Sequence, residues 1–354
     1  MSALFDPVTI RSVTFANRIW VSPMCQYSAK EGVATQWHDV HIGSFATGGA
    51  GMIMMEATGV VPEGRISTTC LGLWNEAQQK RLKPIVEFAH SMGTKIGIQL
   101  AHAGRKASCL PPWSDHPMAS KEEGGWECVA PSAISFGGKY PVPRELSKEE
   151  IKDLISAFAK SAARAVEAGF DLVEIHAAHG YLIHQFLSPI SNQRSDEFGG
   201  SFENRTRFIL EIAKAVRQVI PDSMPLFVRI SASDWLEDGW TIDESVELCK
   251  LLKEVGVDLI DVSSGGTSTG APVPVGPGYQ VPFAERIRRE SNIPTCAVGL
   301  ITEAKQADQI VQRGEADAVM MAREFLRNPR WPLQAAQELG AEVSWPNQLL
   351  RGKN

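Results

Sequence analysis

Phe170-Asp-Leu-Val-Glu-Ile175 is a short, mainly apolar run, and it leads directly into His176-Ala-Ala-His179-Gly-Tyr181. We expect the apolar run to form a buried strand and the second stretch to begin a loop. Two imidazoles and a phenol therefore emerge together where a strand ends. Two N–H donors and a nearby O–H can hold one substrate oxygen and deliver one proton. That set suits a reaction in which negative charge builds on a carbonyl oxygen.

Similar apolar or β-branched runs recur along the chain and alternate with helical patterns. The candidate strands are 19–22, 52–56, 95–100, 172–176, 226–230, 259–263, 295–298 and 318–321. Eight β-then-α units predict a closed parallel barrel, a (β/α)8 TIM barrel, with residues 1–354 as a single domain. An open doubly wound sheet is the competitor, but the glycine fingerprint for a dinucleotide after a first strand is absent.

Helix boundaries are marked by local signals. Ser147-Lys-Glu-Glu150 and Thr241-Ile-Asp-Glu244 are capping-box patterns that predict two helix starts. Apolar residues then recur at helical spacing from Ile151 to Ala162. Four glycines stand where helices are expected to stop, namely Gly93, Gly169, Gly256 and Gly314.

Three segments lie outside the repeating β–α pattern. Residues 5–17 are expected to form a small hairpin that closes the barrel floor. Residues 105–146, rich in Pro, Gly and Trp, form a long insertion after the third strand, and loops of that length are usually functional. Its Trp113 and Trp126 either line the substrate cleft or pack the insertion. We place the tail 340–354 at a subunit interface.

Composition excludes several classes of protein. The chain has 354 residues, of which 44% are hydrophobic and 21% charged, as in ordinary globular proteins. A formal net charge of −6 without a basic run argues against nucleic-acid binding. No stretch approaches the roughly 20 apolar residues of a membrane span, and the N-terminus lacks a signal-peptide pattern. The six cysteines show no metal-binding spacing, so we expect reduced thiols, no metal and a cytoplasmic protein.

The ends of the expected strands carry polar groups, and the chemistry of such barrels gathers at those ends. Gln99 in the third strand and Arg229 in the fifth would suit the pyrimidine edge of a flavin. Backbone N–H groups near Gly299 and a helix opening at Arg323 would suit a phosphate. A ring-binding pair on one side and a phosphate site on the other indicate flavin mononucleotide (FMN), held without a covalent bond.

Five motifs in order along the chain resemble the old yellow enzyme family of FMN-dependent ene-reductases, and the bacterial branch with a cysteine near the flavin most of all. The motifs are 22–27 (SPMCQY), 99–106 (QLAHAGRK), 176–181 (HAAHGY), 196–205 (DEFGGSFENR) and 323–329 (REFLRNP). Each alone is weak evidence, whereas all five on a barrel pattern are specific. The resemblance covers essentially the whole chain.

The resemblance implies a role for each matching residue. FMN should be surrounded by Ser22, Pro23, Met24, Cys25, Ala57, Gln99, Arg229, Ser263, Gly299, Ala322 and Arg323. The substrate should be contacted by Tyr27, His176, His179, Tyr181 and Arg351. Of these, His176 and His179 should hydrogen-bond the substrate carbonyl, and Tyr181 should donate the proton. Cys25 should sit near flavin N5 and modulate its potential.

The activity implied is that of an NADPH dehydrogenase or ene-reductase. It would reduce α,β-unsaturated ketones, aldehydes and maleimides, with nitro-compounds as a further class, by ping-pong hydride transfer through flavin N5. Arg351 resembles an arginine that reaches a neighbouring subunit's site, which implies a homodimer or homotetramer. Two positions depart from the family pattern: Ala322 stands where a glycine is common, and Leu349 stands where a tyrosine is usual.

Alternatives remain open for several of these residues. His176 and His179 could be a metal pair, although no third ligand is evident at zinc-enzyme spacing. Cys25 could be a small apolar residue, and Tyr181 could merely cap its loop. Arg229 could pair structurally with Asp261 or Glu174. At the level of the whole protein, the competitors are another FMN barrel oxidoreductase, a metal-dependent hydrolase or aldolase, and a binding protein without chemistry.

Overall fold

The computed structural model describes residues 2–353 and contains a closed eight-stranded barrel. The strands are β3 (Ile19–Val21), β4 (Met52–Gly59), β5 (Lys95–Ala101), β8 (Leu172–Ala177), β9 (Leu226–Ser231), β10 (Leu259–Ser263), β11 (Thr295–Val298) and β12 (Ala318–Met321). They pair in parallel around the ring in the order β10-β11-β12-β3-β4-β5-β8-β9. The eight predicted strands and the (β/α)8 fold are confirmed.

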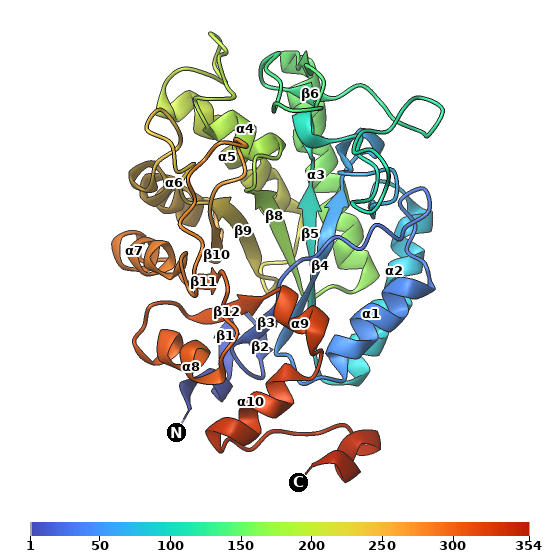
Figure 1. Ribbon diagram of the computed structural model, residues 1–354, viewed down its shortest axis with the longest axis vertical. Helices are drawn as coiled ribbons and strands as arrows, with labels where there is room; N and C mark the ends of the chain where they lie inside the picture. Colours follow the sequence, from blue (N-terminus) through green and yellow to red (C-terminus); the bar gives the residue numbers. More distant parts are fainter. Residues whose placement is uncertain (1, 354) are drawn as a thin grey trace.

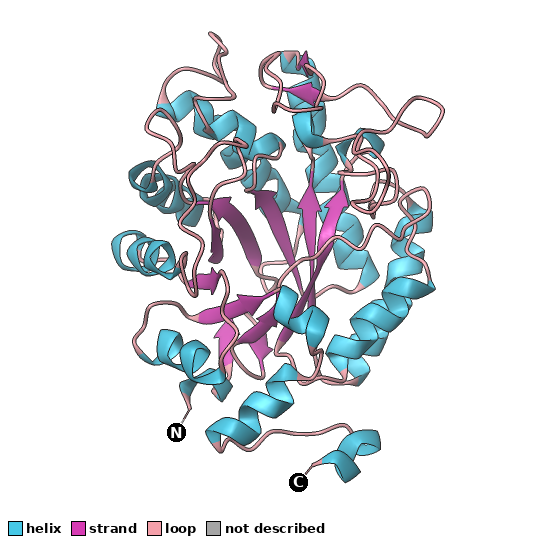
Figure 2. Cartoon of the chain, in the orientation of Figure 1, coloured by secondary structure: helices cyan, strands magenta, loops and turns pink. Residues whose placement is uncertain are grey.

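Helices surround the barrel, as Figures 1 and 2 show. They are α1 (Gln36–Ala46), α2 (Glu76–Ser91), α3 (Lys148–Ala168), α4 (Leu182–Leu187), α5 (Phe202–Val219), α6 (Ile242–Glu254), α7 (Val281–Ser291), α8 (Ala304–Gln312), α9 (Arg323–Arg327) and α10 (Trp331–Leu339). Short 3-10 turns are η1 (Ala3–Phe5), η2 (Pro62–Gly64), η3 (Gly104–Lys106) and η4 (Asn347–Gly352). Among residues 2–353, none of these helices is long and apolar enough to cross a bilayer.

The predicted helix signals are present. At the start of α3 the Ser147 hydroxyl accepts from the Glu150 N–H at 3.2 Å, and the Glu150 carboxylate accepts from the Ser147 N–H at 2.8 Å. Thr241 and Glu244 make the same reciprocal bonds at α6. Gly169 ends α3 in the left-handed region with φ of +91°.

The N-terminal hairpin closes the floor of the barrel, as predicted. Its strands are β1 (Val8–Ile10) and β2 (Val13–Phe15). The fully buried Phe15 ring lies 4.9 Å from Trp20 and 6.4 Å from Phe227, centroid to centroid. Because both partners stand near the beginning of their strands, this aromatic cluster fills the N-terminal end of the barrel. The opposite end is left for the polar side chains.

The insertion at 105–146 follows β5 and contains the short paired strands β6 (Val129–Ala130) and β7 (Arg144–Glu145). Its base is tied to the loops of other barrel strands. Arg105 Nη2 donates to the Thr267 carbonyl at 2.8 Å, and Lys106 Nζ donates to the His179 carbonyl at the same distance. The insertion therefore helps to shape the rim where β8 and β10 end.

The C-terminal segment lies at the other end of the molecule. Residues 344–348 border a cavity with the C-terminal ends of α1 and α2, at Ala46 and Ser91. Helices of the barrel run antiparallel to its strands, so these helix ends mark the floor side. Figure 1 shows the same arrangement, with the C-terminus beyond α10 and the arrowheads of β4, β5 and β8 pointing away from it.

Candidate active site

The loop after β8 carries the two histidines and the tyrosine in a constrained backbone conformation. His179 has φ of +59°, a left-handed value that is uncommon for a residue with a side chain. Its N–H donates to Ser231 Oγ at 2.8 Å, while its carbonyl accepts from Lys106 Nζ. These two bonds hold the residue in a conformation that the isolated loop would disfavour.

The three side chains lie together, as the spacing predicts. The ring of His176 is 5.1 Å from that of His179 and 5.1 Å from that of Tyr181, with interplanar angles of 76° and 70°. His176 is buried, and the other two are partly exposed at the barrel mouth. The two imidazoles and the phenol therefore border one position at the C-terminal ends of the strands.

The protonation states of this cluster follow from its surroundings. Burial, and after it the charge of Arg229, lowers the pKa of both His176 and His179 well below 6.5. Burial raises the pKa of Tyr181 well above 10. At neutral pH the imidazoles are therefore neutral, each with one N–H, and the phenol keeps its proton.

The hydrogen bonds at the two imidazoles differ. Nδ1 of His176 is buried without a hydrogen-bond partner. Nε2 of His179 lies 2.7 Å from Ser263 Oγ, which in turn donates to Gln280 Oε1 at 3.3 Å. Because the Gln280 amide nitrogen donates to the Val298 carbonyl, its oxygen is fixed as the acceptor. Nε2 of His179 is then the donor, and Ser263 Oγ occupies the place that another oxygen could take.

A polar cluster lies beside the histidines at the strand ends. Gln99 Nε2 donates to Glu174 Oε1 at 2.7 Å, and Arg229 donates to Ser22 Oγ at 3.2 Å. Arg229 Nε also lies 3.1 Å from Asp261, so the structural pairing held open above is present. Burial, together with the charge of Asp261, raises the pKa of Glu174 to about 8. Asp261 is therefore the counter-ion, and Glu174 is neutral at pH 7.

The Arg229 ion pair does not saturate the guanidinium. Its buried Nε lies 3.1 Å from Asp261 without an aligned hydrogen bond, and its Nη1 donates to Ser22 Oγ. A guanidinium has five N–H donors, so some of them are left for a ligand. Arg229, Gln99 and Ser22 can therefore hold the polar edge of a ring.

A cavity of about 220 Å³ opens at the ends of β11 and β12. It is lined by Ser263, Tyr279, Gln280, Val298, Gly299, Leu300, Ile301, Thr302, Met320, Met321, Ala322, Arg323, Glu324 and Arg327. Gly299, Ala322 and Arg323 were expected at a phosphate, and the structure brings them together here. Ser263 links this cavity to His179, so the two halves of the site are continuous.

The segment after β3 supplies the other predicted residues. Pro23, Met24, Cys25 and Tyr27 are partly buried, and Tyr27 has φ of +51°. The Tyr27 ring packs edge-on against Trp113 of the insertion at 5.7 Å. Ala57 lies where the register of β4 shifts against β5, between Met55 and Thr58. Such a bulge re-aims side chains at the rim of a barrel.

The two insertion tryptophans have different surroundings. Trp113 is 71% exposed and contacts Tyr27, which is one of the residues expected to meet the substrate. Trp126 donates from Nε1 to the Glu63 carbonyl at 2.8 Å, and Arg65 lies 5.0 Å above its ring. Trp126 therefore packs the base of the insertion. Arg351 is exposed in the C-terminal segment on the floor side, and one chain alone does not bring it to the histidines.

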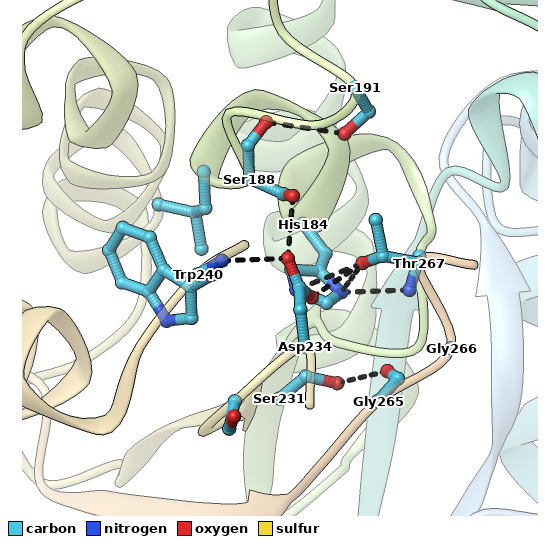
Figure 3. A network of polar contacts seen from close by, with 12 residues as sticks. His184, Ser188, Ser191, Ser231, Asp234, Trp240, Gly265, Gly266 and Thr267 are labelled. Atoms are coloured by element: carbon cyan, nitrogen blue, oxygen red, sulfur yellow. Dashed lines mark hydrogen bonds and ion pairs between the residues drawn. The ribbon is translucent and has the colours of Figure 1, made fainter. Parts of the chain in front are cut away.

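A buried network behind the site, shown in Figure 3, escaped the sequence analysis. Asp234 Oδ1 lies 3.0 Å from His184 Nε2 and accepts from Thr267 Oγ1 at 2.8 Å. Its other oxygen accepts from the Ser188 hydroxyl at 2.6 Å and the Trp240 N–H at 2.8 Å. The network joins the segments after β8, β9 and β10. In the sequence, the network is marked only by an aspartate three residues after a strand. Such an aspartate is common, and it does not indicate a network unless its hydrogen-bond partners are known.

The residues fit the FMN that the sequence predicts. An unsaturated buried guanidinium faces Ser22, and a glycine-containing cavity at β11 and β12 can admit a phosphate. Phosphate sites of such barrels are frequently built from the loops after these two strands. Gln99, Arg229 and Ser22 would hold the ring, and Gly299, Ala322 and Arg323 the phosphate.

Comparisons with known proteins agree with this architecture. A model of the NADH:flavin oxidoreductase / NADH oxidase family matches residues 3–342. An NADPH dehydrogenase of Geobacillus sp. (strain WCH70) is 52% identical over 351 residues, covering 99% of this chain and 98% of its own. Morphinone reductase superposes with a TM-score of 0.80 at 28% identity, covering 98% of this chain and 92% of its own. The old yellow enzyme homologue of Zymomonas mobilis gives 0.79 at 28%, covering 97% and 94%.

Proposed function

The chain belongs to the NADH:flavin oxidoreductase / NADH oxidase family, and from the geometry of its site we propose that it reduces electron-poor C=C bonds at the expense of NADPH. It is an FMN-dependent oxidoreductase of the old yellow enzyme type. The acceptors proposed are α,β-unsaturated ketones, aldehydes and maleimides, with nitro-compounds as a further class. The observation that carries the proposal is the paired neutral imidazoles next to a protonated phenol.

Bound FMN would be the two-electron carrier between NADPH and the β-carbon of the second substrate. The protein's part is to make that carbon electrophilic. His176 and His179 are neutral donors that can both bond one carbonyl oxygen, which draws electron density out of the conjugated double bond. Removing one such donor costs about 10²–10³ in rate in comparable oxyanion sites.

His179 must change its partner for this purpose. Its Nε2 is bonded to Ser263 Oγ, so a substrate oxygen replaces a hydroxyl rather than bonding a bare donor. The exchange of one oxygen acceptor for another is nearly balanced in hydrogen-bond energy. The binding energy must then come from contacts with the rest of the substrate. The two imidazoles favour an oxygen that can accept a hydrogen bond from each of them.

Tyr181 supplies the proton for the α-carbon. Burial keeps the phenol protonated, and its ring lies 5.1 Å from that of His176. A phenol is a weak acid toward a carboxylate but adequate toward the carbon of an enolate. The Lys106 ammonium lies 5.2 Å from the same ring and offsets negative charge that develops on the oxygen.

Colour and turnover test the proposal directly. The purified protein should be yellow, should bleach when NADPH is added without oxygen, and should regain colour on addition of cyclohexenone. A His176→Ala/His179→Ala double variant should bleach at the parent rate but regain colour at least about 10²-fold more slowly. His116→Ala, a half-exposed histidine in the insertion, is the control. Reduction of cyclohexenone at the parent rate by the double variant would overturn the carbonyl-binding role.

The metal-dependent hydrolase finds no support in the ligand geometry. Within residues 2–353, neither His176 nor His179 belongs to a group of three side chains close enough to share a metal. An aldolase would need a Schiff-base lysine. Lys106 is the lysine near the site, but its Nζ donates to two backbone carbonyls, those of His179 and Gly266.

We also propose a homodimer or homotetramer in which Arg351 enters a neighbouring chain's site. The support is that Arg351 is exposed on the floor side and reaches no site residue of its own chain. Size-exclusion chromatography with light scattering should report more than one chain. Arg351→Ala should raise KM for the enone and leave kcat nearly unchanged, whereas Lys353→Ala should alter neither. A monomer with full activity would refute this part.

A further inference from the structure

We propose that Cys25, Glu56 and Cys70 form a binding site for a thiophilic divalent cation, such as Zn²⁺ or Cd²⁺, at the edge of the active site. The three side chains come from different parts of the barrel. Cys25 follows β3, Glu56 lies in the irregular part of β4, and Cys70 belongs to the loop between η2 and α2. Sequence spacing could not reveal this group, because its members stand 31 and 14 positions apart.

The distances suit direct coordination. The two Sγ atoms and one carboxylate oxygen of Glu56 all lie within 4.8 Å of one another. Zinc binds thiolate sulfur at about 2.3 Å and carboxylate oxygen at about 2.0–2.2 Å, so ligand atoms around one tetrahedral ion stand roughly 3.3–3.8 Å apart. Glu56 and Cys70 are buried and Cys25 is partly exposed, so an ion would enter from the Cys25 side.

Further contacts hold the prospective ligands in place. Glu56 Oε2 accepts from the Gln26 N–H at 3.1 Å, and Oε1 lies 3.2 Å from His38 Nε2. Nδ1 of His38 accepts from the Thr35 N–H at 3.0 Å, which leaves the ring proton on Nε2, facing the carboxylate. Cys70 Sγ lies 3.4 Å from Ser67 Oγ. Outer partners of this kind orient metal ligands and raise affinity.

The charge balance favours a soft divalent ion. A cation M²⁺ would displace one proton from each thiol and bind two thiolates and one carboxylate, giving a net charge of −1 and releasing two protons. Thiolates select zinc-like ions over Mg²⁺ or Ca²⁺. Three protein ligands leave one tetrahedral position for water.

Such binding would act on catalysis. We placed Cys25 beside the cofactor, and a metal would take its sulfur as a ligand. The holoenzyme should therefore be inhibited when one equivalent of Zn²⁺ binds. Cys70 and Glu56 have no proposed role in the reduction, so a variant of either residue tests metal binding alone.

The test is calorimetric titration of Zn²⁺ into the holoenzyme, after its thiols have been reduced and a chelator has removed bound metal. One equivalent per chain should bind to the wild type. Loss of an outer partner alone costs about 10–100-fold in affinity, so Cys70→Ala should lose at least about 100-fold while its zinc-free activity stays at the parent level. Cys249→Ala, which removes a buried thiol of α6, should titrate like the wild type.

A second measurement does not depend on any variant folding. Cd²⁺ added to the wild-type holoenzyme should produce a sulfur-to-cadmium charge-transfer band in the ultraviolet that saturates at one equivalent. The proposal is wrong if that band is missing, or if Cys70→Ala binds Zn²⁺ as tightly as the parent. Equal loss of affinity in Cys249→Ala would also overturn it.

Discussion

The backbone N–H of Gly180 donates a 2.8 Å hydrogen bond to Nδ1 of His184, one helical turn further along the chain. This bond fixes the His184 proton on Nε2, which lies 3.0 Å from Asp234. Asp234 also holds Thr267 and Ser188, so the loop with His179 and Tyr181 is anchored to two other strand-end loops. The carbonyl-binding pair is therefore positioned by a buried carboxylate that touches no substrate.

Asp234→Asn is expected to destabilise the protein and loosen that loop. The variant cannot accept all of the donors that converge on Asp234, and each buried donor left without an acceptor costs about 1–3 kcal/mol. We expect a lower free energy of unfolding in denaturant titration and a lower kcat for cyclohexenone, with bound FMN retained. Asp238→Asn, an exposed carboxylate of the same loop, should change neither. An unchanged free energy of unfolding in Asp234→Asn would show that the network does not stabilise the fold.

The same residue gives an acid-dependent signature. Burial opposes ionisation of Asp234, but His184 and the hydrogen bonds from Ser188 and the Trp240 N–H outweigh it and lower the pKa to about 2. A carboxyl whose folded pKa is depressed stabilises the fold fully above its unfolded pKa of about 3.9. That stabilisation is lost as the pH falls through 2. Asp234→Asn should therefore unfold with a flatter pH dependence than the parent between pH 4 and 2.

The neutral state of the imidazole pair predicts the pH profile of the reaction. Because the pKa of both rings lies well below 6.5, kcat/KM for the enone should not change between pH 6 and 8 through their titration. A neutral amide donor can then replace one ring. His179→Asn should keep a rate well above that of His179→Ala. If kcat/KM rose as the pH was lowered and either histidine became protonated, the histidines would not act as neutral donors.

Tyr181→Phe separates the two halves of the cycle. The variant keeps the ring that packs against His176 but loses the proton donor, a loss typically worth about 10²–10⁴ in rate. Rapid-mixing measurements should show reduction by NADPH at the parent rate and slower reoxidation by cyclohexenone. Tyr140→Phe in the insertion serves as the control, since its hydroxyl meets Cys109 rather than the histidines. If both half-reactions were unaffected, the proton would have another source.

Gly299→Ala tests the phosphate side. Gly299 has φ of +127°, and an added methyl group would lie 2.9 Å from the Gln280 amide nitrogen and 3.0 Å from the Tyr279 ring. The variant should retain less FMN after dialysis, which the absorbance of the flavin measures. Gly270→Ala, where an added methyl group meets nothing within 4 Å, should retain as much FMN as the parent. Full retention in Gly299→Ala would place the phosphate elsewhere.

The barrel was predictable because its signals are local. The eight strands are short apolar runs, and the capping boxes at Ser147 and Thr241 mark helix starts within four residues. The strand ends then located Gln99, Arg229 and Ser263 without any structure. Residues that act through distant partners could not be found in this way.

Asp234 and Cys70 illustrate what the sequence could not show. An aspartate after a strand and a cysteine in a loop are common, and only three-dimensional proximity gives them a role. Asp234 lies beside His184 across 50 positions of sequence, and Cys70 lies beside Cys25 across 45. Arg351 stays a prediction, because its expected target lies in another chain.

The most direct test of the paired donors is a crystal of the holoenzyme soaked with p-hydroxybenzaldehyde. We expect the phenolate oxygen within hydrogen-bond distance of both His176 and His179, with Ser263 displaced from His179 and the ring lying over the flavin. A phenolate oxygen bound away from both imidazoles, with the 2.7 Å contact between His179 and Ser263 intact, would contradict it.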